Sequence, residues 1–216
     1  MILTPIAPER LEETLALYET ALAGDPYLTP IFQRIADSRF RLDGADAVTW
    51  ARWHRDAVEL TRRFGMDPID EEPQAAYSWD GWHVRTVSQP DVLIHEVAHF
   101  QVASPARRRR LDFGLGAGPE TGEKARADAE LSVGPMTREY EEALASLLGV
   151  LWEVELGQAG ILAFQEQNWL EGAGRASAAD FFRRVLADLT AWGLLDAEGR
   201  PLYALRQDED PPSARF

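Results

Sequence analysis

Apolar residues recur at helical spacing along residues 91–103, and this stretch also contains two of the four histidines. Its apolar positions are Val92, Leu93, Val97, Ala98 and Val102. The spacing predicts one buried helix, which Ser104 and Pro105 would end.

The same spacing predicts further helices before and after this stretch. We expect them at residues 8–22, 47–64, 123–131, 136–150, 158–170 and 177–192. Residues 75–87 are rich in aromatic and β-branched residues, with Asp80 and Gly81 at a turn position, a pattern that predicts a hairpin. Residues 200–206 would form a short strand. The expected fold class is α+β: predominantly helical, with the buried helix at its centre and a small antiparallel sheet beside it.

Breaks in the pattern divide the chain into three parts. Residues 66–74 are acidic and contain two prolines, as is typical of a linker. We therefore expect a helical N-terminal appendage at residues 1–66 and a metal-binding catalytic core at residues 67–206. Residues 207–216 would be a disordered acidic tail.

The buried helix contains His95, Glu96 and His99 in an HExxH pattern, in a chain with only four histidines. Histidines four apart lie on one helix face, so both can bind one divalent ion. A structural pair of hydrogen-bonded histidines is the less probable alternative, at about one chance in ten given the false-positive risk of short motifs. Zinc hydrolysis and iron oxidation both use two histidines and a carboxylate, so the pattern does not choose between them.

A carboxylate from a later helix should complete the site. The candidates are Glu139, Glu141 and Glu142, followed by Asp128 and Glu130. His83, in the expected hairpin, is a weaker candidate for a third ligand, and His54 is more typical of a packing or surface residue.

Composition and charge limit the kinds of partner that the protein is expected to bind. The net charge of −14 disfavours direct binding to nucleic acid and favours a cationic ligand, although it also serves ordinary solubility. The chain has no cysteine, which excludes disulfides and thiolate metal ligands. We expect a cytoplasmic protein without membrane association, because no signal peptide or membrane-spanning run is visible. Arg107–Arg110 are the one basic cluster, most simply a solvated face that an acidic partner could contact.

Three blocks of the sequence resemble the elongation factor P hydroxylases. They are residues 82–85 (WHVR), 93–114 (LIHEVAHFQVASPARRRRLDFG) and 133–140 (VGPMTREY). With a fainter similarity at 183–206, the resemblance covers roughly residues 75–206. It departs from the family at Leu115 and Gly116, where aromatic residues are usual, and throughout residues 1–74.

The resemblance implies a non-haem iron hydroxylase that acts on a lysine-type side chain of a protein, either elongation factor P or a substrate with a similar cationic side chain. His95, His99 and Glu139 would hold the metal, with Fe(II) favoured and Zn(II) as the alternative. Glu96 would then orient the site or manage a proton. In a zincin-like zinc peptidase, Glu96 would instead be the general base. A third interpretation is a non-catalytic metal-binding interaction module.

Overall fold

The computed structural model describes residues 7–210 and is built mainly from helices around two long central ones. The helices of the first half are η1 (Pro8–Arg10), α1 (Leu11–Leu22), α2 (Leu28–Asp37), η2 (Ser38–Leu42), α3 (Ala47–Arg63), η3 (Pro73–Ala75) and α4 (Pro90–Val102). Those of the second half are η4 (Leu111–Gly114), α5 (Lys124–Ala129), α6 (Pro135–Glu155), α7 (Ile161–Glu166) and α8 (Ala176–Ala191). The strands are β1 (Asp67–Ile69) and β2 (His83–Arg85).

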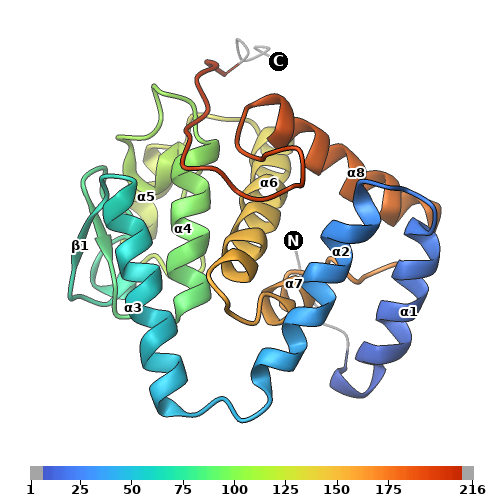
Figure 1. Cartoon of the computed structure of the whole chain (residues 1–216). Helices are drawn as coiled ribbons and strands as arrows, with labels where there is room; N and C mark the ends of the chain where they lie inside the picture. The colour runs from blue at the N-terminus through green and yellow to red at the C-terminus, as the bar shows by residue number, and fades with distance from the viewer. Residues whose placement is uncertain (1–6, 211–216) are drawn as a thin grey trace.

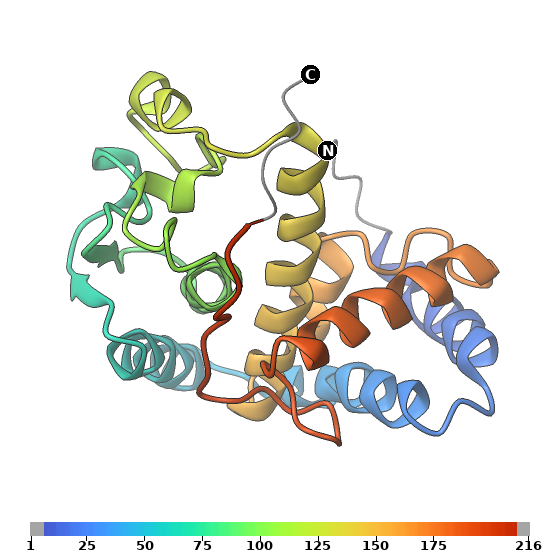
Figure 2. The same ribbon diagram turned by 90° about the horizontal axis from the view of Figure 1, so that it is seen from above.

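The helix predicted at residues 91–103 is α4, and it lies in the middle of the molecule between α3 and α6 (Figures 1 and 2). Pro90 occupies its first turn, where the missing N–H costs no intrahelical hydrogen bond. Apolar side chains on nearly all sides of α4 are buried, including Leu93, Ile94 and Val97. A helix that is enclosed on nearly all sides needs no polar face toward solvent. Solvation therefore does not explain why α4 contains His95, Glu96 and His99.

The small sheet is parallel, and the predicted antiparallel hairpin is wrong. Asp67 pairs with His83 and Ile69 with Arg85 in parallel register. The partner strand β1 thus comes from the segment interpreted as a linker. Only an isolated antiparallel bridge between Trp79 and Val84 remains of the expected hairpin. No strand forms at residues 200–206 either; an isolated bridge joins Leu195 and Pro201.

One hydrophobic cluster extends through both halves of the described chain. Tyr18 of α1, Phe32 of α2 and Trp53 of α3 belong to the same buried cluster as Val97 of α4 and Leu148 of α6. Tyr18 stacks on Phe32 with ring centroids 4.9 Å apart, and both lie near Phe164. The segment predicted as an appendage therefore shares its core with the segment predicted to be catalytic.

The C-terminal segment after α8 returns across α4 (Figure 1). The Gln101 side-chain amide donates to the carbonyls of Leu202 and Ala204, at 2.9 and 2.8 Å. Of the predicted disordered tail, residues 207–210 are described and residues 211–216 lie outside the described range. Among the described residues, no helix is both long and apolar enough to span a bilayer.

Candidate metal centre

His95 and His99 project from one face of α4 toward α6. Their Nε2 atoms are 3.0 Å apart, and the two rings are nearly perpendicular, with interplanar angle 84°. His99 is buried and stacks on Phe113 with ring centroids 5.5 Å apart. The helical spacing of four thus places two imidazole nitrogens at a single point, as the sequence predicted.

Glu142 of α6 supplies the carboxylate at this point. Its Oε2 lies 3.6 Å from Nε2 of His95 and 3.4 Å from Nε2 of His99. The Glu142 side chain is 44% exposed, against 21% for His95 and 6% for His99. The site therefore opens to solvent on the side of the carboxylate.

The structure does not bring Glu139, the carboxylate that the sequence favoured, to the two histidines. Glu139 is exposed and does not belong to the His95–His99–Glu142 group, the one cluster among the described residues whose donor atoms suit a metal ion. Both glutamates are on α6, where three residues correspond to about 300° of rotation and roughly 4.5 Å of rise. Glu142 faces α4, and Glu139 lies almost one turn nearer the N-terminus of α6.

The three donor atoms fit a divalent cation in both spacing and chemistry. Atoms 3.0, 3.4 and 3.6 Å apart lie on a circle of radius roughly 1.9 Å, close to the bond lengths of about 2.0–2.2 Å that imidazole and carboxylate make to zinc. The Nδ1 atoms of both histidines are buried and have no hydrogen-bond partner in the described chain. Metal-bound histidines usually donate this N–H to a fixed acceptor, so here packing, such as that of Phe113 on His99, has to orient the rings.

The charges of the three groups depend on one another. Burial alone would lower the pKa of His99, but the Glu142 carboxylate raises it to about 9. Burial and the positive charge of His99 lower the pKa of His95. Burial would raise the pKa of Glu142, yet the two histidines lower it well below its usual range. Without a metal, one proton is thus held between the two rings beside an ionised carboxylate, and a metal cation would have to displace it.

Glu96 lies beside the metal-binding group and is not part of it. Burial raises the pKa of Glu96 to about 8, partly offset by the charge of His99 and by a hydrogen bond with Ser78. Nearby Asp112 and Glu142 raise it further. A carboxyl group with a pKa near neutrality can both accept and release a proton at physiological pH.

Sequence reasoning missed the residues that support this group. Arg107, interpreted as part of a solvated basic face, is 3% exposed and forms an ion pair with Glu141, the neighbour of Glu142. Its Nη1 also donates to the carbonyl of Phe113 at 2.9 Å. A buried acidic residue on the later helix would have indicated a buried arginine. The sequence does not show which acidic residues are buried, so it gave no such signal.

The turn before Phe113 has a strained backbone. Asp112 and Phe113 have φ values of 40° and 57°, a region that residues other than glycine seldom occupy. Asp112 accepts from Thr121 Oγ1 at 2.5 Å and from the Trp79 N–H at 3.3 Å. These bonds hold the turn that places the Phe113 ring against His99, consistent with strain stored beside a functional site.

The other two histidines do not join the group. His83 lies with Asp80, whose Oδ2 is 3.1 Å from its Nδ1. The Nε2 atom of His54 lies 2.8 Å from the carbonyl oxygen of Thr86. Neither His83, the weaker candidate for a third ligand, nor His54, expected to be a packing or surface residue, thus lies with the two histidines of α4.

Comparisons of the chain with models of protein families, with curated proteins and with solved structures found no match.

Proposed function

We propose that the protein is a metal-dependent hydroxylase of the non-haem iron type, acting on a lysine-type side chain of a protein substrate. The observation that carries the proposal is the convergence of His95 Nε2, His99 Nε2 and Glu142 Oε2 on one point at the α4–α6 interface. Two histidines and one carboxylate that leave coordination positions open are the ligand set of non-haem Fe(II) oxygenases. The resemblance of residues 75–206 to elongation factor P hydroxylases selects hydroxylation among the reactions this set performs.

Each residue has a distinct part in this proposal. His95, His99 and Glu142 would hold Fe(II), which supplies the activation of dioxygen. Hydroxylation places one oxygen atom of dioxygen in a C–H bond and releases the other as water, so it requires two electrons from a reductant and two protons. Glu96, with its pKa of about 8, is the side chain beside the site best suited to deliver a proton.

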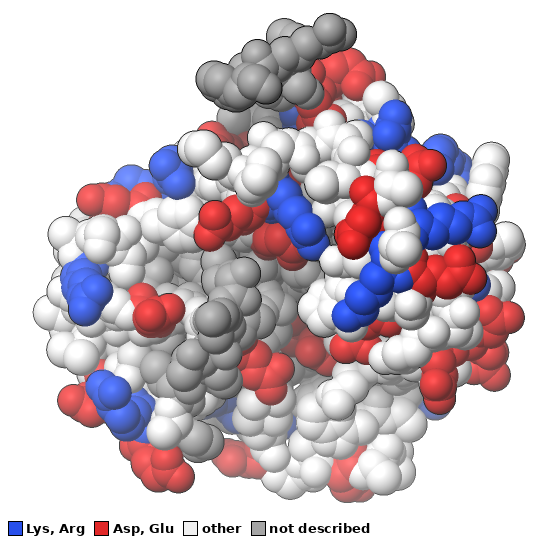
Figure 3. Space-filling model, turned by 180° about the vertical axis from the view of Figure 1, so that it is seen from behind, with Lys and Arg blue, Asp and Glu red and all other residues white. Residues whose placement is uncertain are grey.

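The proposed substrate has a cationic side chain, with elongation factor P as the first candidate, and the reaction would take place in the cytoplasm, where translation factors work. The net charge of −14 supports attraction to a cationic side chain. On the face seen in Figure 3, acidic and basic side chains are interspersed. The attraction would therefore come from the overall charge rather than from one acidic area on this face.

A zinc hydrolase is the second candidate, and Glu96 favours it. In this reaction Glu96 would take the proton from a water molecule at the metal, a task for which a base with a pKa near neutrality is suited. A carboxylate from a later helix, here Glu142 on α6, also suits this class. The metal and the dependence on oxygen separate the two candidates.

The first experiment is metal analysis of protein purified without oxygen, as wild type, Glu142→Ala and Glu139→Ala. We expect stoichiometric iron in the wild type and in Glu139→Ala, and at least tenfold weaker binding in Glu142→Ala, because loss of a ligand costs more than the roughly 10–100-fold of an outer-shell change. Equal metal retention in all three variants would contradict the assignment of Glu142.

The identity of the metal decides between the functions. Iron, with oxygen-dependent modification of a lysine-type side chain in a protein, would support hydroxylation. Tightly held zinc, with cleavage of unstructured peptides that Glu96→Gln abolishes while the metal stays bound, would favour the hydrolase. Absence of metal from wild-type protein, with a partner that His95→Ala still binds, would favour the interaction module.

A further inference from the structure

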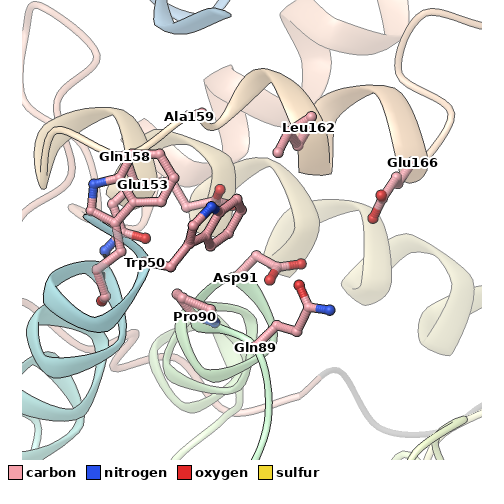
Figure 4. A pocket seen from close by; sticks show the side chains of 10 residues that line it. Trp50, Gln89, Pro90, Asp91, Glu153, Gln158, Ala159, Leu162 and Glu166 are labelled. Carbon is pink, nitrogen blue, oxygen red and sulfur yellow. Dashed lines mark hydrogen bonds between the residues drawn. The ribbon is translucent and has the colours of Figure 1, made fainter. Parts of the chain in front are cut away.

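A second polar pocket lies at the beginning of α4, where α3, α6 and α7 meet (Figure 4). Its volume is about 40 Å³, several times the roughly 10–15 Å³ that one water molecule needs. Its lining combines three acidic side chains, Asp91, Glu153 and Glu166, with two indoles, Trp50 and Trp53. None of these residues belongs to the candidate metal centre.

Glu153 lies in the wall of this pocket. It is 4% exposed, and no ion pair joins its carboxyl group to a cationic side chain of the described chain. Burial raises the pKa of Glu153 well above its usual range, and the negative charges of Asp91 and Glu166 add to this shift. The raised pKa favours the protonated, neutral carboxyl group in the absence of a counter-charge, and a cation beside Glu153 would stabilise the ionised form and offset the repulsion from Asp91 and Glu166.

The Trp53 indole N–H lacks a hydrogen-bond acceptor in this pocket. Its side chain is 2% exposed and lines the pocket, and its Nε1 atom is buried without a hydrogen-bond partner among the described residues. Buried indole N–H groups usually have an acceptor. The pocket has room for a water molecule that would accept from this donor, so Trp53 indicates that the pocket is occupied and Glu153 indicates the charge of the occupant.

The arrangement favours an organic cation over a metal ion. The carboxylates of Asp91, Glu153 and Glu166 do not meet the spacing of a metal-binding group, which the described chain satisfies only at His95, His99 and Glu142. Trp50 is 36% exposed at the pocket and contacts Trp53 edge-on, with ring centroids 4.9 Å apart. Aromatic faces attract organic cations, and the apolar side chains of Pro90 and Leu162 complete the wall.

We propose that this pocket binds a small alkylammonium group, whose charged nitrogen lies near Glu153 and Asp91 and whose carbon substituents contact Trp50 and Leu162. In Figure 4 the side chains of Gln89, Asp91 and Glu166 gather on one side of the pocket and Trp50 lies on the other, which leaves space for such a group between them. This inference does not rest on the proposed hydroxylase activity, because it uses no metal ligand.

The test is a titration of the full chain, labelled with nitrogen-15, with methylammonium and tetramethylammonium chloride. Indole N–H resonances report the binding, and Trp50→Phe and Trp53→Phe variants assign them. We expect saturable shifts of the Trp50 and Trp53 resonances. The dissociation constant should rise at least tenfold in Glu153→Gln and stay within twofold in Glu155→Gln, an exposed neighbour on α6.

Trp50→Ala is a second variant, and it should not disturb the packing of the hydrophobic core because this side chain is partly exposed. It should weaken binding severalfold while the melting temperature stays close to that of the wild type. Sodium chloride at equal ionic strength is the control for screening. Shifts that sodium reproduces, shifts that only magnesium or calcium produces, or equal binding by wild type and Glu153→Gln would each overturn the proposal.

Discussion

At the scale of single residues, Arg107 is held by ion pairs with two carboxylates. Its buried guanidinium contacts Glu141 through two nitrogens, with Nη1 donating to Oε1 at 3.0 Å, and its Nε donates to Asp210 at 2.6 Å. Removing one member of such a group leaves another charge buried without compensation. Because Glu141 precedes Glu142, the same contact also holds α6 next to the candidate metal ligand.

We predict that Arg107→Met lowers the free energy of unfolding by about 3–5 kcal/mol, the range for breaking a buried ion pair. Glu141→Met should have a similar effect, and the double variant should lose clearly less than the sum of the two. Urea unfolding of all four proteins measures this coupling. Arg110→Met is the matched control: its pair with Glu130 is 3.8 Å long and about half exposed, so it should cost less than about 1 kcal/mol. Additive losses would show that Arg107 and Glu141 act separately.

The sequence was sufficient for part of this site. A spacing of four in a helix determines where two histidines lie relative to one another, so His95 and His99 could be predicted without a structure. The choice between Glu139 and Glu142 depends on how α6 is rotated against α4, and no local pattern contains that rotation. The resemblance to a known family selected Glu139, and the packing of the helices selects Glu142.

At the scale of helices, the site depends on the close approach of α4 and α6. Gly149 of α6 faces the backbone of His95, and a Cβ atom at residue 149 would lie 3.5 Å from the His95 Cα atom. That distance is an ordinary van der Waals contact, whereas a longer side chain would have to displace α4. The absence of a side chain at Gly149 therefore allows the helix that carries Glu142 to approach the two histidines closely.

We predict that Gly149→Ala is tolerated and raises the free energy of unfolding by up to about 1 kcal/mol, the difference between glycine and alanine in a helix interior. Gly149→Leu should lower it by roughly 1–3 kcal/mol through overpacking and should also weaken metal binding. Thermal unfolding and metal titration test the two effects.

Gly160→Ala is the control away from the histidines, because a Cβ at residue 160 would lie 2.8 Å from the carbonyl oxygen of Val150. It should destabilise the protein and leave metal affinity in the folded protein unchanged. Unchanged metal affinity in Gly149→Leu would contradict the proposed role of helix spacing.

Most helices could be predicted from periodicity, and the sheet could not. The helices α1, α3, α4 and α8 lie within a few residues of their expected positions, since each has an apolar stripe or a clear end. The helix α2 was missed: Pro26 precedes it and Pro30 lies in its first turn, so the segment is similar to a turn. The pairing of β1 with β2 joins segments more than a dozen residues apart, and parallel register leaves no turn signal between them.

At the scale of the whole molecule, Asp210 of the C-terminal segment contacts residues that follow α4. Asp210 contacts Arg107, accepts from Ser104 Oγ at 2.7 Å and lies 3.3 Å from Arg206. Burial would raise the pKa of Asp210, but the hydrogen bonds from Arg107 and Ser104 outweigh it and lower the pKa. Asp210 is thus joined to the ion pair beside α6.

This lowered pKa predicts how the contribution of Asp210 to stability changes with pH. A carboxyl group with a folded pKa below its unfolded value of about 3.9 stabilises the protein fully above that value. The stabilisation disappears as the pH falls through the folded pKa, because the folded state then takes up the proton that the unfolded state already holds. We predict that Asp210→Asn lowers the free energy of unfolding by about 1–3 kcal/mol at pH 7, and that its difference from wild type shrinks below roughly pH 4.

Urea unfolding of both proteins from pH 7 to pH 3 measures this difference. Asp208→Asn, two residues earlier and exposed, should match the wild type at every pH. A difference between Asp210→Asn and wild type that stays constant down to pH 3 would mean that the side chain contributes through packing and not through its charge. An equal loss in Asp208→Asn would mean that the segment contributes only through overall charge. A pH-dependent loss that is specific to Asp210 would show that its carboxylate stabilises the Arg107–Glu141 pair. Because Glu141 is on α6, the same contact would also stabilise the helix that presents Glu142.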